Sequence, residues 1–152
     1  MNRRKTMIVR VGTACVLSLP LAAAGCRSAS PTATEPPTGG RELVLDEAAF
    51  VATVGPILTS RGCDNVACHG GGLRGTFQLS PADAKDYDFD FVQARLQVDA
   101  VDREASNLLL KPLDPAAGGV AHTAPASESG FLDAADPDFQ AIRAWILAGE
   151  LR

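Results

Sequence analysis

Two cysteines and a histidine stand close together in residues 59–71, which read TSRGCDNVACHGG. Four residues separate Cys63 from Cys68, and His69 follows Cys68 directly. Covalent haem attachment uses the similar pattern Cys-x-x-Cys-His, in which two thiols bond the haem and the histidine binds its iron. The two additional residues here can loop outward while both sulfurs keep their places. The segment therefore predicts a haem c site.

The same residues allow three other interpretations. In an oxidising compartment, Cys63 and Cys68 can close a disulfide. Cys63, Cys68, His69 and His122 have the number of ligands of a closed tetrahedral zinc site, although adjacent residues seldom converge on one small ion. A nucleophilic cysteine with a histidine base would need an orienting group that the sequence does not supply. The Cys68–His69 pair and the glycines after it favour haem over these alternatives.

Residues 1–25 have the form of a bacterial secretory signal peptide. Four basic residues accompany an almost wholly apolar stretch at residues 11–24, which is too short to span a membrane stably. Residues 23–26 read AAGC and resemble the lipobox of bacterial lipoproteins, in which the cysteine is lipidated and becomes the new N-terminus. We therefore expect a periplasm-facing or cell-surface lipoprotein, held at the membrane by a lipid on Cys26. The alternative is an ordinary cleavage after residues 22–24, which would leave Cys26 as a spare cysteine.

The remaining chain divides into a linker and one domain. Residues 26–42 are rich in Ser, Thr, Pro and Gly, which predicts a flexible tether. Residues 43–152 are enough for one domain with one core. Loss of residues 1–25 removes four of the 14 Lys and Arg but none of the 18 Asp and Glu, so the net charge becomes −8. This charge argues against nucleic acid as a partner and favours a redox partner protein with a basic docking face.

Apolar periodicity predicts an all-α fold, a small helical domain with long loops. In residues 46–62, Asp46 is expected to cap a helix whose apolar side chains recur at intervals of three and four. Pro56 is expected to kink or divide this helix, and Gly62 is expected to end it. The cysteine segment would then begin directly after a helix terminus.

Three further helices are expected. Residues 90–98 form the first, with its buried face supplied by Val92, Leu96 and Phe89. Residues 104–110 form a short second one, and residues 112–136 are irregular. Asp136 caps the last helix and Pro137 takes its first position. The apolar stripe of this last helix consists of Phe139, Ile142, Trp145 and Ile146. Asp86, Asp88 and Asp90 alternate as in a calcium loop, but the glycine and the final glutamate are missing, so a solvated turn is expected there.

Four segments, taken in order, resemble the small cytochrome c-type domains of planctomycete and myxobacterial secreted proteins. They are FVATVGPILTSRGCDNVACHG (residues 50–70), LRGTFQLS (73–80), ASNLLLKPL (105–113) with a later histidine, and DPDFQAIRAWILAG (136–149). The resemblance covers nearly all of residues 50–149. It implies a cytochrome c-like helical fold with one covalent haem c. It also implies that Cys63 and Cys68 are the thioether attachments and that His69 is the proximal iron ligand.

The second iron ligand is expected to be His122. Both methionines lie in the signal peptide, and His122 is the only histidine besides His69. Lys111 is a second candidate once its ammonium has lost a proton. A pair of histidines gives a lower reduction potential than histidine with methionine. The sequence therefore predicts an electron carrier and not an enzyme by itself, although it could be the redox subunit of a larger one. The alternative is a haem-free lipoprotein, stapled by a Cys63–Cys68 disulfide, that serves as an interaction module.

Overall fold

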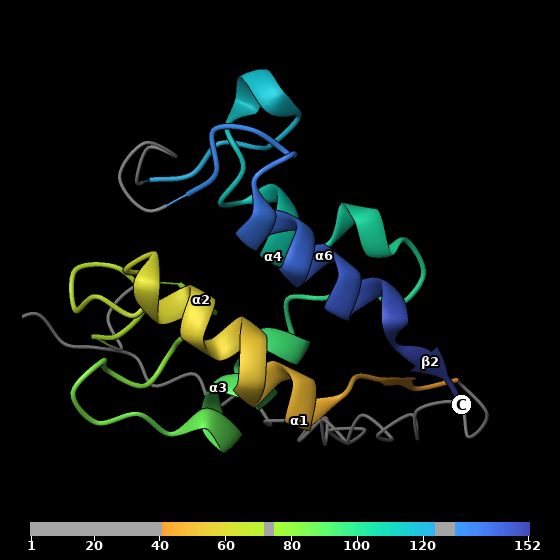
Figure 1. Ribbon diagram of the computed structural model, residues 1–152, viewed down its shortest axis with the longest axis horizontal. Coiled ribbons are helices and arrows are strands. Elements are labelled where there is room, and N and C mark those ends of the chain that lie inside the picture. The colour runs from red at the N-terminus through yellow and green to blue at the C-terminus, as the bar shows by residue number, and fades with distance from the viewer. Residues whose placement is uncertain (1–40, 72–74, 124–129) are drawn as a thin grey trace, which may run out of the picture. The chain divides into compact units, whose positions relative to one another are not determined.

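The computed structural model describes residues 41–71, 75–123 and 130–152, which form a mainly helical domain with long loops, as predicted (Figure 1). The elements are β1 (Leu43–Val44), α1 (Glu47–Ala49), η1 (Phe50–Val54), α2 (Gly55–Ser60), α3 (Tyr87–Arg95), η2 (Arg103–Ala105), α4 (Asn107–Leu110), η3 (Pro115–Ala117), α6 (Pro137–Ala148) and β2 (Glu150–Leu151). The predicted signal peptide, Cys26 and nearly all of the tether lie outside the described residues. Within the described ranges, no helix is both long and apolar enough to cross a membrane.

The elements α1, η1 and α2 follow one another without a gap and lead to the cysteines. Asp46 caps α1 as predicted, its carboxylate accepting the N–H of Ala49 at 2.9 Å. The segment η1 is a π-helix, and Pro56 lies in the first turn of α2 after it. A proline has no N–H, so it is accommodated where the hydrogen-bond pattern changes from π to α. Gly62 ends the helix with a φ of +71°, a conformation that favours glycine.

The helix α6 supplies the other main wall of the core. The carboxylate of Asp136 accepts the N–H of Asp138 at 2.9 Å, and Pro137 takes the first helical position, both as predicted. The predicted stripe of α6 is buried in full, and the ring of Trp145 packs on Phe50 at 5.4 Å between centroids. The indole N–H of Trp145 also donates to the backbone carbonyl of Asp46 at 2.7 Å. The start of α1 is thereby tied to the last helix of the chain.

The buried face predicted for the helix at residues 90–98 is wrong. The helix α3 begins at Tyr87, three residues earlier than expected, and its buried residues are Asp90, Phe91 and Ala94. The three residues expected to be buried, Phe89, Val92 and Leu96, are 39%, 47% and 66% exposed. The reason is that Phe91 packs against Phe50 and Trp145, with ring centroids 5.6 and 6.4 Å away. These aromatic contacts orient the helix more strongly than its own apolar spacing does.

The solvated turn predicted for the three aspartates is also wrong. Asp86 is the N-cap of α3, its carboxylate accepting the N–H of Phe89 at 3.0 Å. Asp90 is only 1% exposed and belongs to a buried polar cluster. A carboxylate can be buried in this way when hydrogen bonds and an opposite charge replace its water.

The short helix expected at residues 104–110 is divided into η2 and α4 by Ser106. This residue has a ψ of 132°, outside the helical region. Its buried hydroxyl donates to the carbonyl of Arg103 and accepts the N–H of Asp99, at 2.5 and 3.1 Å. A serine side chain that bonds nearby backbone groups competes with helix formation, which explains the break.

The two ends of the described domain meet in a small antiparallel sheet. Leu43 of β1 pairs with Leu151 of β2, and Glu42 exchanges two backbone hydrogen bonds with Arg152, at 2.8 and 3.0 Å. Ordered pairing thus already includes Glu42, at the end of the predicted tether. Farther along the chain, the irregular region is held by a bridge between Leu113 and Phe131.

Candidate functional site

The end of α2 places Cys63 through its backbone. The N–H of Gly62 donates to the carbonyl of Thr59, and the N–H of Cys63 donates to that of Leu58, both at 2.9 Å. This pair of bonds is the Schellman arrangement, in which a glycine with positive φ reverses the chain. Cys63 is therefore the first residue after a well-defined helix terminus.

The loop from Cys63 to Gly70 folds back on itself. The N–H of Cys68 donates to the carbonyl of Asn65 at 2.8 Å, and that of His69 donates to the carbonyl of Cys63 at 3.1 Å. The N–H of Gly70 reaches the Asn65 carbonyl at 3.0 Å. The four residues between the cysteines are thus a closed turn, which brings His69 back beside Cys63.

The glycines after His69 permit this closure. A Cβ on Gly70 would lie 1.8 Å from the carbonyl oxygen of Asp64, and one on Gly71 would lie 2.4 Å from that of Val66. Both distances are shorter than any contact that a side chain can make. The glycines were counted in favour of haem from the sequence, and the structure shows that Gly70 and Gly71 make room for the loop's own backbone.

We predict that Gly70→Ala costs more than the roughly 1–3 kcal/mol of ordinary overpacking, because a backbone carbonyl must move. The matched control is Gly62→Ala, where φ is positive but no atom lies within 4 Å of the added Cβ. There the cost should be only the 1–2 kcal/mol of a left-handed alanine. Urea denaturation of the exported protein measures both, and equal losses would contradict the close approach at Gly70.

His69 is oriented by a backbone carbonyl. Its Nδ1 lies 3.0 Å from the carbonyl oxygen of Phe77, and its ring packs on the Phe77 ring at 4.7 Å. With the Nδ1 proton donated to that carbonyl, Nε2 carries a lone pair and is available to a metal. Burial lowers the pKa of His69; the bond to Phe77 opposes this shift, and the nearby His122 adds to it. The imidazole is therefore neutral at pH 7, the form that ligates metals.

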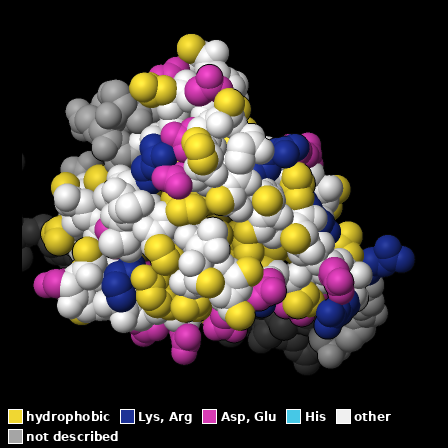
Figure 2. All heavy atoms as spheres, viewed as in Figure 1, with side chains coloured by type: hydrophobic (Ala, Val, Ile, Leu, Met, Phe, Trp, Pro, Cys, Tyr) yellow, Lys and Arg dark blue, Asp and Glu magenta, His cyan; other side chains and the backbone are white. Residues whose placement is uncertain are grey.

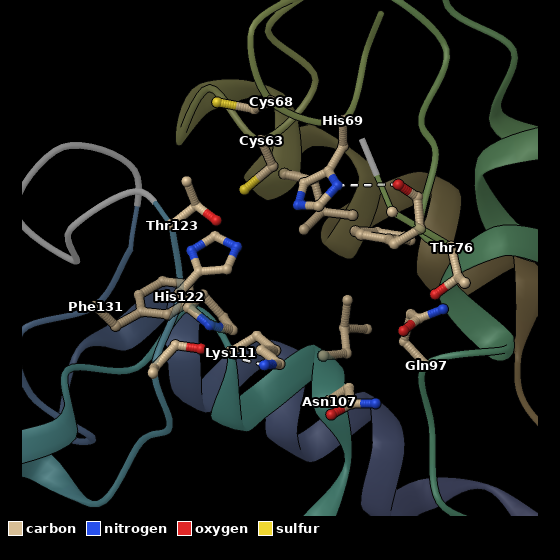
Figure 3. Close-up of a pocket in the computed structure, with 16 residues that line it drawn as sticks. Cys63, Cys68, His69, Thr76, Gln97, Asn107, Lys111, His122, Thr123 and Phe131 are labelled. Carbon is tan, nitrogen blue, oxygen red and sulfur yellow. Dashed lines mark hydrogen bonds between the residues drawn. The ribbon is translucent and has the colours of Figure 1, made fainter. Parts of the chain in front are cut away.

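A pocket of about 320 Å³ opens beside His69 (Figure 3). Cys63, Cys68, His69 and His122 all line it, so the structure brings the four predicted site residues of the domain to one place. The apolar part of the lining comes from Leu58, Phe77, Leu108, Pro112 and Phe131. Pockets for small organic ligands begin at about this volume and are lined in this way, by apolar walls with a few polar groups.

The two imidazoles face the same space from opposite sides. The ring centroids of His69 and His122 are 6.0 Å apart, with an angle of 22° between the ring planes. In Figure 3 the sulfur of Cys63 points toward the space between the two rings, whereas the sulfur of Cys68 lies farther from it. His122 is exposed at the pocket rim, while His69 is half-buried. Lys111, the other candidate ligand, also lines the pocket.

The structure also bears on the interpretations of the cysteines as a nucleophile or as part of a zinc site. Cys63 and Cys68 are both thiols. Burial raises the pKa of Cys63 to about 12, with further contributions from Asp64 and Cys68, so this thiol is protonated at neutral pH and is a poor nucleophile. In the described ranges, no three histidine, cysteine or acidic side chains are placed to hold a metal ion together. That finding disfavours the four-ligand zinc site.

A buried ionic cluster supports the cysteine loop, and the sequence analysis missed it. The ammonium of Lys85 lies 2.6 Å from the carboxylate of Asp90 and 3.2 Å from that of Asp64, the residue after Cys63. Asp64 also accepts the hydroxyl of Thr59 at 2.8 Å, and Asp90 accepts the N–H and hydroxyl of Ser80 at 2.6 and 2.9 Å. The cluster therefore ties the loop to α2 and to the start of α3. Only the residue types of DYDFD, with a lysine before them, hinted at it.

An arginine joins the end of α2 to the start of α6. One guanidinium nitrogen of Arg61 lies 2.8 Å from both carboxylate oxygens of Asp136, and Nε lies 2.8 Å from Asp138. The guanidinium also lies over the ring of Phe131, 4.8 Å from its centroid. Because Phe131 lines the pocket, Arg61 fixes one of its walls relative to the cysteine loop.

Comparison with protein-family models, with curated proteins and with solved structures found no match to this chain. The chemistry of the pocket residues therefore has to carry the functional conclusion.

Proposed function

We propose that this chain is a lipid-anchored monohaem c-type cytochrome that transfers single electrons in the bacterial envelope. One observation carries the proposal: His69, held by the Phe77 carbonyl, presents Nε2 to a pocket that Cys63, Cys68 and His122 also line. Two thiols, an oriented imidazole and a second imidazole across the space form the donor set that a covalently attached haem needs. The residues present fit that group.

Each pocket residue has a distinct part in this proposal. Cys63 and Cys68 would hold the haem by thioether bonds, and His69 and His122 would bind its iron, His69 as the proximal ligand and His122 as the distal one. The apolar side chains of the lining, such as Leu108 and Phe131, would exclude water from the bound group. The neutral state of His69 supports ligation at pH 7, because no proton competes with the metal for the lone pair on its ring nitrogen. A bound haem supplies reversible one-electron chemistry at its iron, and the protein sets the potential and the access of partners.

The partner is proposed to be another redox protein. After loss of the signal peptide the chain carries a net charge of −8, which attracts a basic docking face. On the side of the molecule in Figure 2, acidic side chains are spread among basic and apolar ones and do not form a single patch. Steering by total charge does not require such a patch, and it should weaken as salt is added. The lipid on Cys26 would keep the domain at the membrane through its tether.

The test is to express the whole chain in bacteria that have the machinery for c-type haem maturation. We expect a red protein whose haem stays attached after denaturation, and a mass increase corresponding to one haem. The Cys63→Ser/Cys68→Ser variant is the matched control, and it should lose the covalently held haem completely. A reduced spectrum with sharp low-spin bands would support ligation by two histidines.

The opposite result is equally clear. A colourless protein, in which mass spectrometry finds Cys63 and Cys68 joined by a disulfide, would contradict the cytochrome proposal. The chain would then be the haem-free, disulfide-stapled lipoprotein. Lipidation is tested separately by the mass of the N-terminal peptide, which should begin at a diacylated Cys26.

A further inference from the structure

We propose that Lys111 is a positioning residue, which holds His122 in place as the second iron ligand by bonding the backbone before it. The inference rests on the proposed haem function. In the sequence, Lys111 and His122 were the two candidates for that ligand. In the structure, the side chain of Lys111 bonds a backbone carbonyl instead. Its ammonium donates to the carbonyl of Ala121, the residue before His122, at 3.1 Å.

The stretch that carries His122 is irregular and is fastened to α4. The N–H of Gly119 donates to the carbonyl of Asp114 at 3.0 Å, and the N–H of Val120 donates to that of Leu110 at 2.9 Å. The bond from Lys111 to Ala121 continues this series by one residue. Of these three hydrogen bonds it is the nearest to His122 in the chain, and its donor is a side chain.

The backbone of Lys111 is anchored to the helical core. It follows α4 directly and its N–H donates to the carbonyl of Asn107 at 3.0 Å. The preceding residues Leu108 and Leu109 are buried in the core, 5% and 1% exposed. The backbone of Lys111 is therefore held by the helical core, and its side chain can position the irregular stretch that carries His122.

The two histidines would then be held in different ways. His69 is half-buried, and its ring is oriented directly by the Phe77 carbonyl. His122 is exposed, and the position of its backbone is set through residues 119–121. Loss of the Lys111 bond should therefore leave His69 in place and loosen only His122. The pocket would become more open to an outside ligand on the His122 side.

The experiment is a titration of the oxidised haem protein with imidazole, which competes with His122 for the iron. Lys111→Met should bind imidazole about 2- to 10-fold more tightly than the unaltered protein, the change expected for the loss of one hydrogen bond. Lys111→Arg, which keeps a donor, should restore most of the difference. Arg95→Met removes an exposed positive charge that pairs with Glu42 instead, and it should change nothing.

A double-mutant cycle separates positioning from a direct effect on the pocket. In a His122→Ala background, Lys111→Met should no longer alter imidazole binding, because the histidine through which it acts is gone. An equal change in both backgrounds, or no change in either, would overturn the inference while the cytochrome proposal stands. Haem content is measured first, and a protein without covalent haem would overturn the proposed function and, with it, this inference.

Discussion

Replacing Lys85 by methionine is expected to destabilise the domain by about 3–5 kcal/mol, the cost of breaking a buried ion pair from one side. The side chain of Lys85 is 16% exposed, and its carboxylate partners on Asp64 and Asp90 are 3% and 2% exposed. Burial opposes the charge of Lys85, but hydrogen bonds to Asp90 and Asp64 outweigh this and raise its pKa. Without the ammonium, two buried carboxylates remain with no cation between them. Urea denaturation at pH 7 measures the loss.

Two control variants make this prediction specific. Arg95→Met removes a cation from an exposed pair with Glu42, and it should cost less than about 1 kcal/mol. Lys85→Met combined with Asp90→Asn removes one of the stranded charges, and it should recover part of the lost stability. A Lys85→Met loss no larger than that of Arg95→Met would contradict the importance of the cluster.

The cluster also predicts an effect at the pocket. Asp64 follows Cys63, and its bonds to Lys85 and Thr59 hold the turn between the cysteines. Loosening that turn should lower the yield of covalently attached haem in Lys85→Met, but not in Arg95→Met. The buried ions would thus act on the proposed function through the shape of the loop.

The sequence predicts well where the signals are local. Asp46 and Asp136 cap helices as expected, because a carboxylate at that position bonds N–H groups two or three residues ahead. The stripe of α6 is buried as expected, because this helix has one continuous apolar face. Gly62 ends α2 as expected, since few other residues adopt its positive φ.

The sequence fails where distant partners decide the outcome. The face of α3 with the better apolar spacing is the exposed one, because Phe91 finds Phe50 and Trp145, residues far away in the chain. Asp90 looked solvated because Ser80 and Lys85 reach it only in the folded structure. The Phe77 carbonyl that orients His69 could not be predicted either, because every residue has a backbone carbonyl and the residue type does not show which one is used.

The candidate site shows the same division. The cysteine motif and His69 could be named from their spacing, which is a local pattern. His122 was named because few alternatives remained, and its place across the pocket depends on contacts between residues 110–121 that the sequence does not display. Lys111 was considered as a ligand because of its chemistry, whereas its hydrogen bond to Ala121 could be found only in the structure.

Replacing His69 by alanine is expected to have a large effect on iron ligation at the proposed cofactor site. Cys63 and Cys68 would still be able to hold a haem, but the reduced low-spin bands should largely disappear, because one of the two proposed iron ligands is gone. The bond to Phe77 is lost as well, which should cost about 1 kcal/mol of stability. Visible spectroscopy and urea denaturation of the exported protein measure the two effects.

The comparison with His122→Ala tests whether the two histidines have different roles. His69 is half-buried and oriented by a backbone carbonyl, whereas His122 is exposed on an irregular stretch. His122→Ala should also lose the low-spin bands, because it removes the other proposed ligand, but added imidazole should restore them, since the haem stays bound to His69 and the opposite side of the iron is open. If imidazole restored the bands equally in both variants, the two histidines would be equivalent. The proximal role of His69, and the part of the Phe77 carbonyl in setting it, would then be wrong.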